Sequence, residues 1–138
     1  MQFFLDTNIV LYAAGGPHPL RESCASVLRR VADGRLNATV NSEVIQEILY
    51  VLIRRGRRHD ALKLADHLTS LFPDLLAVTR EDVATACGLL RRYPRLTVRD
   101  AVHVGTMLRN GLRTVVSVDS DFDQVAEIRR VDPAAIDV

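Results

Sequence analysis

The chain opens with MQFFLDTN (residues 1–8), a short apolar run that ends on an acid. Residues Gln2–Leu5 predict a buried β-strand, and Thr7 and Asn8 are small polar residues that can begin a helix. In a parallel α/β protein, the carboxyl ends of the strands are where ligands and catalytic groups collect. Asp6, which the first strand places there, is therefore a candidate metal ligand.

Apolar strands alternate with helical periods along the rest of the chain. The predicted strands are Gln2–Leu5, Leu36–Val40, Leu75–Val78, Thr114–Val118 and Arg129–Val131. The predicted helices are Asn8–Ala14, Leu20–Ala32, Ser42–Arg55, Asp60–Leu71, Glu81–Tyr93 and Val98–Arg109. This alternation predicts an α/β fold in which five parallel strands, joined by right-handed crossovers, form a sheet with helices on both faces.

Length and composition indicate one globular domain over residues 1–138. The chain is 48% hydrophobic, and a domain of this size buries about two-thirds of its unfolded surface. Since no apolar run approaches the ~20 residues of a membrane span and no signal-peptide pattern is seen, we expect a cytoplasmic protein without a membrane partner. Cys24 and Cys87 lie in apolar helical contexts, without metal-binding spacing, and predict buried thiols rather than a disulfide or a zinc site.

The formal net charge of +1 neither requires nor excludes nucleic acid. All but one of the 18 basic residues are arginines, and the densest basic cluster is RRGRR at residues 54–58. Because the guanidinium group binds phosphate through two donors, Arg54, Arg55, Arg57 and Arg58 are candidate RNA contacts. The alternative is a solvated helix end that the helix dipole favours.

An acid lies on the apolar side of the predicted helix Val98–Arg109. Asp100 falls within the arc that contains Ala101 and Val104, where a carboxylate is costly to bury unless it is paired, hydrogen-bonded or metal-bound. The alternative is a structural role, as the third residue of a capping box headed by Thr97.

Two acids occur in the helix predicted over Ser42–Arg55. Glu47 lies roughly 40° from the edge of the apolar face and Glu43 roughly 80° from it, so Glu47 is the better candidate for a half-buried site. Glu43 is better placed to neutralise the N-terminal dipole behind a cap at Ser42 or Asn41. An ion pair with an arginine is the ordinary alternative for Glu47.

Three acids follow the predicted strand Thr114–Val118. Asp119 is the first residue beyond the strand and is best placed to face the carboxyl edge of the sheet. Asp121 and Asp123 are further candidates for the metal, or caps of a short helix, or solvated side chains. The calcium-loop pattern is excluded because its central glycine and final glutamate are missing.

These acids have one property in common, a predicted position at the carboxyl edge of the sheet. At ~4 Å and an effective dielectric of about 20, each pair of carboxylates repels by about 4 kcal/mol, so such a site needs divalent cations or protonated acids. Oxygen ligands favour Mg²⁺ or Mn²⁺ over zinc, and a cation held this way supports hydrolysis of a phosphodiester. The sequence therefore predicts a metal-dependent nuclease.

Four short motifs carry a family resemblance: Leu5–Asn8 (LDTN), Gln46–Leu49 (QEIL), Arg99–Val102 (RDAV) and Ser117–Phe122 (SVDSDF). In this order and spacing they resemble the PIN domain, and most closely the VapC-type toxins of bacterial toxin–antitoxin pairs. The resemblance spans essentially the whole chain. It implies a PIN-like fold with a five-stranded parallel sheet, Mg²⁺- or Mn²⁺-dependent endoribonuclease activity, a homodimer, and inhibition by a small VapB-like antitoxin.

The resemblance also implies roles for individual residues. The four acids of the family site correspond to Asp6, Glu47, Asp100 and Asp119, of which we expect Asp6, Asp100 and Asp119 to hold the metal. The polar residues that accompany these acids correspond to Thr7, Asn8 and Ser117. Two departures from the family pattern are Asn41, where serine is frequent, and Gly105, where alanine is frequent.

Two further side chains are candidates through their neighbours. His103 lies one helical turn from Asp100, which suggests a general base, but it also lies near Met107 on the packing face. We therefore favour a role in packing, or in supporting the metal ligands. Arg99, beside Asp100, joins the arginine cluster as a candidate RNA contact.

The leading interpretation is an endoribonuclease toxin of a type II toxin–antitoxin pair, and it leaves transfer, ribosomal and messenger RNA open as targets. The alternative is a PIN-fold nuclease of RNA processing or DNA repair without a toxin role. A metal-binding signalling domain, of the response-regulator kind, also gathers acids at the edge of a parallel sheet. It normally needs a late lysine, and no lysine follows Lys63.

Overall fold

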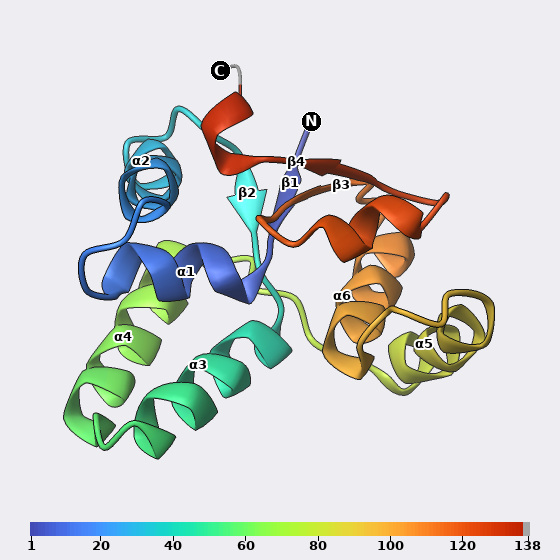
Figure 1. Ribbon diagram of the computed structural model, residues 1–138, viewed down its shortest axis with the longest axis horizontal. Coiled ribbons are helices and arrows are strands. Elements are labelled where there is room, and N and C mark those ends of the chain that lie inside the picture. Colours follow the sequence, from blue (N-terminus) through green and yellow to red (C-terminus); the bar gives the residue numbers. More distant parts are fainter. Residues whose placement is uncertain (137–138) are drawn as a thin grey trace.

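The strands of the computed structural model, which describes residues 1–136, pair in parallel into one sheet (Figure 1). The sheet order is β2-β1-β3-β4, so the first strand lies in the middle. The strands are β1 (Phe3–Leu5), β2 (Ala38–Thr39), β3 (Thr114–Val116) and β4 (Arg129–Val131). Parallel pairing brings the carboxyl ends of β1 and β3 to one edge, and the residues after them, Asp6 and Ser117, become neighbours.

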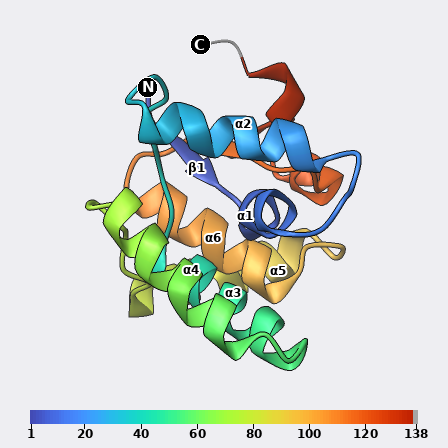
Figure 2. The same cartoon turned by 90° about the vertical axis from the view of Figure 1, so that its left-hand side faces the viewer.

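Six α-helices flank the sheet, and each was predicted to within two residues. They are α1 (Thr7–Ala14), α2 (Arg21–Ala32), α3 (Ser42–Arg54), α4 (Arg58–Leu71), α5 (Arg80–Arg92) and α6 (Val98–Arg109), with two short 3₁₀ helices, η1 (Ser120–Gln124) and η2 (Pro133–Ala135). In both views α2 and α6 lie on opposite sides of β1 (Figures 1 and 2). None of the helices within residues 1–136 has the length and apolar character needed to cross a membrane.

The prediction of a fifth strand over Leu75–Val78 was wrong. This segment makes only one parallel bridge, at Leu76, whose amide donates to the carbonyl of Val40 (2.9 Å) and whose carbonyl accepts from the amide of Ser42 (2.9 Å). The side chains of Ser42 and Arg109 then bind the backbone that follows Leu76. The pairing therefore stops after one bridge, and the sheet has four strands.

One continuous core of buried apolar side chains joins the sheet to the helices. Phe4 and Leu5 of β1, Ile48 of α3 and Met107 of α6 are fully buried in it. The helices pack as neighbouring pairs, α1 with α2, α3 with α4 and α5 with α6. The core thus encloses β1, and Asp6 follows directly after the carboxyl end of this strand.

The two cysteines are free thiols, as predicted, but only Cys24 is buried. The expectation that Cys87 is buried was wrong. Helix α5 buries Asp82, Ala86 and Leu89, which share one face, and Cys87 follows Ala86 by about 100° around the helix and is exposed.

A buried ion pair that the sequence analysis did not identify fixes α5 against α6. The Asp82 carboxylate is completely buried and accepts hydrogen bonds from the Thr79 amide (3.0 Å), the Thr106 hydroxyl (3.1 Å) and the Arg109 guanidinium (2.7 Å). Burial alone would raise the pKa of Asp82, but these hydrogen bonds, led by that of Arg109, outweigh it and lower the pKa. The signal in the sequence was the capping-box spacing from Thr79 to Asp82.

Gly105 marks the closest approach of α6 to α5. A Cβ atom placed on Gly105 would lie 2.5 Å from the carbonyl oxygen of Asp82, which is closer than real Cβ atoms come. The obstructing atom belongs to the backbone at the start of a helix, so it cannot move aside as a side chain can. The glycine found where the PIN family often has alanine is therefore required by this packing.

We predict that Gly105→Ala destabilises the protein by about 1–3 kcal/mol, because an extra carbon must force the two helices apart. Gly88→Ala is the matched control, since a Cβ at Gly88 of α5 meets no atom within 4 Å. The control should instead stabilise the helix by about 0.5–1 kcal/mol. Urea unfolding of the three proteins measures both effects, and a Gly105→Ala variant as stable as the parent would contradict the prediction.

Candidate active site

All four acids that the sequence singled out line one cavity of about 420 Å³. Each comes from a different part of the fold, because Asp6 follows β1, Glu47 lies on α3, Asp100 on α6 and Asp119 after β3. The remaining lining residues are Thr7, Asn8, Leu11, Thr97, Val98 and Arg99. The structure therefore brings together residues that are far apart in the sequence.

Asp6 is held by backbone and side-chain hydrogen bonds at the end of β1. Its amide donates to the carbonyl of Val116 (3.0 Å), which continues the pairing of β1 with β3. Its carboxylate caps α1 by accepting from the amide of Thr7 (2.8 Å) and also accepts from the hydroxyl of Ser117 (2.7 Å). This carboxylate is buried and lines the cavity.

The Ser117 hydroxyl is the centre of the polar network. Besides donating to Asp6, it accepts from the Asp119 amide (2.9 Å) and from the Asn8 side-chain amide (3.2 Å). The hydroxyl of Thr7 is buried and has no hydrogen-bond partner in the described part of the chain. The polar residues that the family resemblance indicated thus lie next to Asp6, and Ser117, which also binds Asn8, connects Asp6 to Asp119.

Asp119 forms the cap of η1, so the alternative in which Asp121 or Asp123 caps this helix was wrong. The Asp119 carboxylate accepts from the amide of Asp121 (2.9 Å). Asp123 is exposed and binds Arg130 (2.9 Å), which also donates to the carbonyl of Ser117 (3.0 Å). Neither Asp121 nor Asp123 lines the acidic cavity.

Asp100 forms half of the capping box that the sequence suggested. Its amide donates to the Thr97 hydroxyl (3.2 Å), so the residue does begin α6 in the expected manner. In α5 the acid at the same helical position, Asp82, also returns a hydrogen bond to its cap, and there the box is complete. The buried carboxyl group of Asp100 instead lines the acidic cavity together with that of Asp119.

Burial and the repulsion of neighbouring acids raise the pKa values of Asp6 and Asp100. Burial raises the pKa of Asp100 to about 8, and the negative charges of Asp6 and Asp119 add to this rise. Burial also raises the pKa of Asp6 to about 6, and its hydrogen bonds from Ser117 and Thr7 only partly oppose this rise. A cation in the cavity would relieve this unfavourable crowding of negative charge.

The donors around the cavity suit a hard divalent cation. Asp6, Asp100 and Asp119 present carboxylate oxygens, the ligands that Mg²⁺ and Mn²⁺ prefer. Ligand atoms of Asp6, Asp100 and His103 lie within 4.8 Å of one another. This group contains two of the three predicted ligands, Asp6 and Asp100, while Asp119 lines the same cavity, so the residues present suit a divalent cation.

Glu47 lines the cavity and Glu43 does not. Both face Arg99, whose guanidinium lies 3.5 Å from the Glu47 carboxylate and 3.6 Å from that of Glu43. Asn41 is the cap of α3, as expected, with its side chain accepting from the backbone one turn later. Glu47 thus combines its expected place in the cleft with the ion pair that was its alternative.

His103 is completely buried behind Asp6. Its ring packs against that of Phe4, with centroids 5.3 Å apart, and its Nε2 lies 3.8 Å from the Asp6 carboxylate. Neither ring nitrogen has a hydrogen-bond partner within residues 1–136. Burial, and then the charge of Arg99, lower the pKa of His103 to about 3, so the imidazole is neutral at physiological pH. These contacts support packing beside a metal ligand rather than a solvent-facing base.

The candidate arginines are distributed over different surroundings. Arg99 borders the acidic cavity, whereas Arg55 lines a second cavity beside it. Arg54 donates to a tyrosine hydroxyl one turn earlier in α3, and Arg57, which precedes α4, is held in an ion pair. Arg58 is exposed at the start of α4. Of the candidate arginines, Arg99 lines the acidic cavity and Arg55 lines the cavity beside it.

Comparisons with known proteins agree with this geometry. The family model of the PIN domain matches residues 3–128. Ribonuclease VapC7 of Mycobacterium tuberculosis is 32% identical over 136 residues, which cover 95% of this chain and 91% of the relative. VapC13 of the same organism, also named a ribonuclease, is 29% identical over 127 residues, 92% of this chain and 97% of the relative.

A solved structure confirms the fold expected from the sequence. VapBC2 from Rickettsia felis, bound to a DNA fragment from its promoter, superimposes with a TM-score of 0.74 over 96% of this chain and 98% of that chain. At 16% sequence identity, this likeness concerns the fold alone. The fold is the PIN-like α/β arrangement that the motifs indicated.

We predict that, without divalent cations, the free energy of unfolding falls as the pH rises from about 6.5 to 8. The folded protein keeps a proton on Asp100 up to about pH 8, whereas an unfolded aspartic acid has released it above about pH 4, so folding is favoured at the lower pH. His103, with its pKa lowered to about 3, changes stability only below about pH 6.5. The free energy of unfolding should fall by no more than about 1.4 kcal/mol per pH unit, the limit for release of one proton.

Chemical unfolding in EDTA at several pH values measures this slope. Asp100→Asn should flatten it and stabilise the protein at pH 8, because no charge then forms in the crowded cavity. Asp123→Asn is the matched control, since the Asp123 carboxylate is exposed and paired with Arg130, and it should keep the parental slope. Equal slopes in the parent and in Asp100→Asn would refute the assignment.

Proposed function

We propose that this chain, which belongs to the PIN-domain family, is a divalent-metal-dependent endoribonuclease acting as a single nuclease domain over residues 1–138. The observation that carries the proposal is the convergence of Asp6, Glu47, Asp100 and Asp119 on one cavity. The names of VapC7 and VapC13, both ribonucleases, support RNA as the substrate. Hydrolysis of a phosphodiester is the chemistry that such a set of oxygen donors serves.

Asp6, Asp100 and Asp119 would hold Mg²⁺, for which Mn²⁺ would substitute. When bound, the cation supplies positive charge that polarises the phosphodiester and activates water. The raised pKa values of Asp6 and Asp100 support this assignment. The charged form of a carboxyl group that is buried near other acids is stabilised strongly by a neighbouring cation. Ser117 and Thr7 hold the Asp6 carboxylate in one orientation.

The remaining residues orient the substrate and handle the proton. The proposed role of the Glu47 carboxylate, which lines the cavity beside the Arg99 guanidinium, is to accept a proton from the attacking water. Arg99 itself offers donors to a phosphate at the mouth of the cavity. Neutral His103 supports Asp6 from behind and excludes water from the inner side of the carboxylate.

The cellular role we propose is that of a type II toxin, a homodimer restrained by a VapB-like antitoxin. The VapC names of the sequence relatives and the VapBC complexes among the structures of similar fold support it. An antitoxin arginine would gain from the concentrated negative charge of the acidic cavity and would compete there with metal or RNA.

The first test is cleavage of total RNA in Mg²⁺, with sequencing of the new ends. We predict metal-dependent cleavage that EDTA abolishes. Asp6→Asn, Asp100→Asn and Asp119→Asn should each lower the rate by more than the about 10- to 100-fold typical for residues that only support metal ligands. Undiminished cleavage in excess EDTA would exclude the metal-dependent mechanism.

Two matched controls separate the site from general loss of negative charge. Asp123→Asn removes a carboxylate of the same loop as Asp119 that lies outside the cavity, and it should cleave normally. Glu43→Gln should likewise keep most activity, whereas Glu47→Gln should lose it. Loss of activity in Glu43→Gln with full activity in Glu47→Gln would overturn the choice between these glutamates.

The toxin role predicts growth arrest when the protein is expressed alone and recovery when the adjacent small gene is co-expressed. Asp100→Asn should remove the arrest, because arrest requires cleavage of RNA. Harmless high-level expression of protein that cleaves RNA in vitro would favour the alternative, a nuclease of RNA processing or DNA repair.

A further inference from the structure

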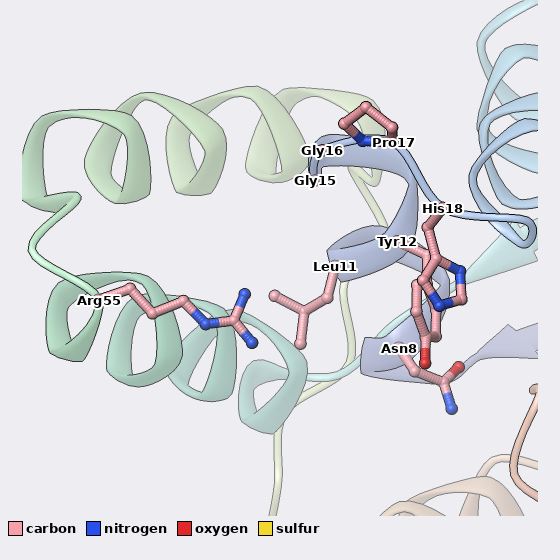
Figure 3. Close-up of a pocket in the computed structure, with 8 residues that line it drawn as sticks. All are labelled: Asn8, Leu11, Tyr12, Gly15, Gly16, Pro17, His18 and Arg55. Atoms are coloured by element: carbon pink, nitrogen blue, oxygen red, sulfur yellow. The ribbon is translucent and has the colours of Figure 1, made fainter.

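A second cavity, of about 320 Å³, lies next to the acidic one, and Figure 3 shows the residues that line it. The two cavities share Asn8 and Leu11, so one opens directly beside the other. The turn of residues 15–17 closes the second cavity on the side of α2, and Arg55 of the α3–α4 connection borders it from the opposite side. A ligand strand that leaves the acidic cavity past Asn8 and Leu11 would therefore enter the second cavity.

One wall of the second cavity is aromatic. The rings of Tyr12 and His18 pack against each other, with centroids 4.6 Å apart and planes inclined by 35°. The amide of Leu20 donates to Nδ1 of His18 (3.1 Å), which orients the ring and leaves the hydrogen on Nε2. Leu11 adds an apolar surface between this wall and Arg55 (Figure 3). A flat, apolar ring with polar edges is the ligand that such surfaces suit.

The opposite wall carries an unpaired cation. Within residues 1–136 the guanidinium of Arg55 forms no ion pair and no hydrogen bond, and in Figure 3 it extends toward Leu11 and the cavity. Arg54, Arg57 and Arg99 each bind another side chain instead. Arg58 is also unpaired within the described residues but does not line this cavity, so Arg55 is the member of the basic cluster that can bind an anion there.

We infer that this second cavity binds the unpaired nucleobase next to the scissile phosphodiester, with Arg55 on an adjoining phosphate. The inference rests on the proposed ribonuclease function and names a specificity subsite for it. Single-stranded RNA is bound by stacking of its bases on aromatic side chains and by cations along its backbone, and Tyr12, His18 and Arg55 provide both. The volume is at the lower end of the roughly 300–1,000 Å³ of ligand cavities, which suits one base rather than a duplex.

A protein partner that inserts an aromatic side chain is the competing occupant. RNA is favoured because the cavity joins the acidic one through Asn8, whose side chain belongs to the hydrogen-bond network of Asp6 and Ser117. A base in the second cavity would therefore lie beside the groups that act on its own phosphate. An aromatic side chain of a protein partner would fill the cavity but would provide no negative charge for Arg55 to bind.

The test uses a short single-stranded RNA that spans a bond cleaved by the parent protein, with 2-aminopurine placed at each position in turn. Binding is measured in the Asp100→Asn background, so that the RNA stays intact. At one position next to the cleaved bond, the fluorescence should be quenched by stacking. Tyr12→Leu should remove the quenching and weaken binding by roughly 5- to 100-fold, whereas Tyr12→Phe should keep both.

Arg55→Gln tests the phosphate contact without disturbing the core, because Arg55 is exposed. It should lower the slope of log affinity against log salt by about 0.7. Arg113→Gln is the matched control, an exposed arginine just before β3, on the far edge of the sheet from the acids, and it should leave the slope unchanged. His18→Ala, also at an exposed residue, replaces Tyr12→Leu if thermal unfolding shows that the latter is not folded.

Three results would overturn the inference. If the parent cleaves no RNA, the proposed function fails and the subsite with it. If the parent cleaves normally while Tyr12→Leu, His18→Ala and Arg55→Gln bind the RNA with unchanged affinity, the function stands and the subsite is wrong. If these variants lose affinity only for the antitoxin, the occupant is a protein.

Discussion

The parallel pairing of β1 with β3 is the constraint on which the site depends. Its register carries the chain from Leu5 and Val116 directly to Asp6 and to Ser117, whose hydroxyl then binds the Asp6 carboxylate. A slip of one residue would turn Asp6 away from Ser117 and reverse the buried and exposed faces of the strand. Because β1 is enclosed by the core, the hydrophobic effect that folds the protein also holds this register, and with it the geometry of the acids.

Two buried aspartates at the same position of neighbouring helices show how surroundings decide the role of a residue. Asp82 and Asp100 each begin a helix after a threonine cap. Asp82 is neutralised by Arg109 and completes its capping box, and its pKa is lowered. Asp100 faces other acids, and its pKa is raised to about 8. Asp82 stabilises the packing of α5 on α6. Asp100 is repelled by the neighbouring acids, and a bound cation would relieve this repulsion, which is typical of a functional site.

Much of this arrangement was predictable from local patterns in the sequence. The helices follow from apolar periodicity and capping residues, and the acids of the cavity from their places after strands or inside apolar arcs. Apart from the cap of η1, which is Asp119, the errors concern contacts between elements that are far apart in the sequence. The segment around Leu76 is apolar enough for a strand but is diverted by side chains of α3 and α6, and the exposure of Cys87 depends on which face α5 turns inward. The requirement for Gly105 and the Asp82–Arg109 pair likewise arise only when two helices meet.

Although the net charge is near zero, four acidic side chains are gathered in one cavity, and an arginine that is unpaired in the part of the chain that the structure describes lies in the cavity beside it. This separation of charge suits the binding and hydrolysis of RNA. Acids without a cationic partner converge at the carboxyl edge of the sheet, where Asp6 and Asp100 are buried together. Most basic groups near them are already bound, as Arg99 is to both Glu43 and Glu47. An RNA phosphate approaching the acids alone would be repelled, so binding must come from cations beside the cavity and from surfaces that attract bases. Arg55 and the Tyr12–His18 pair lie on that path, which links the charge pattern of the sequence to the direction in which a strand of RNA would leave the acids.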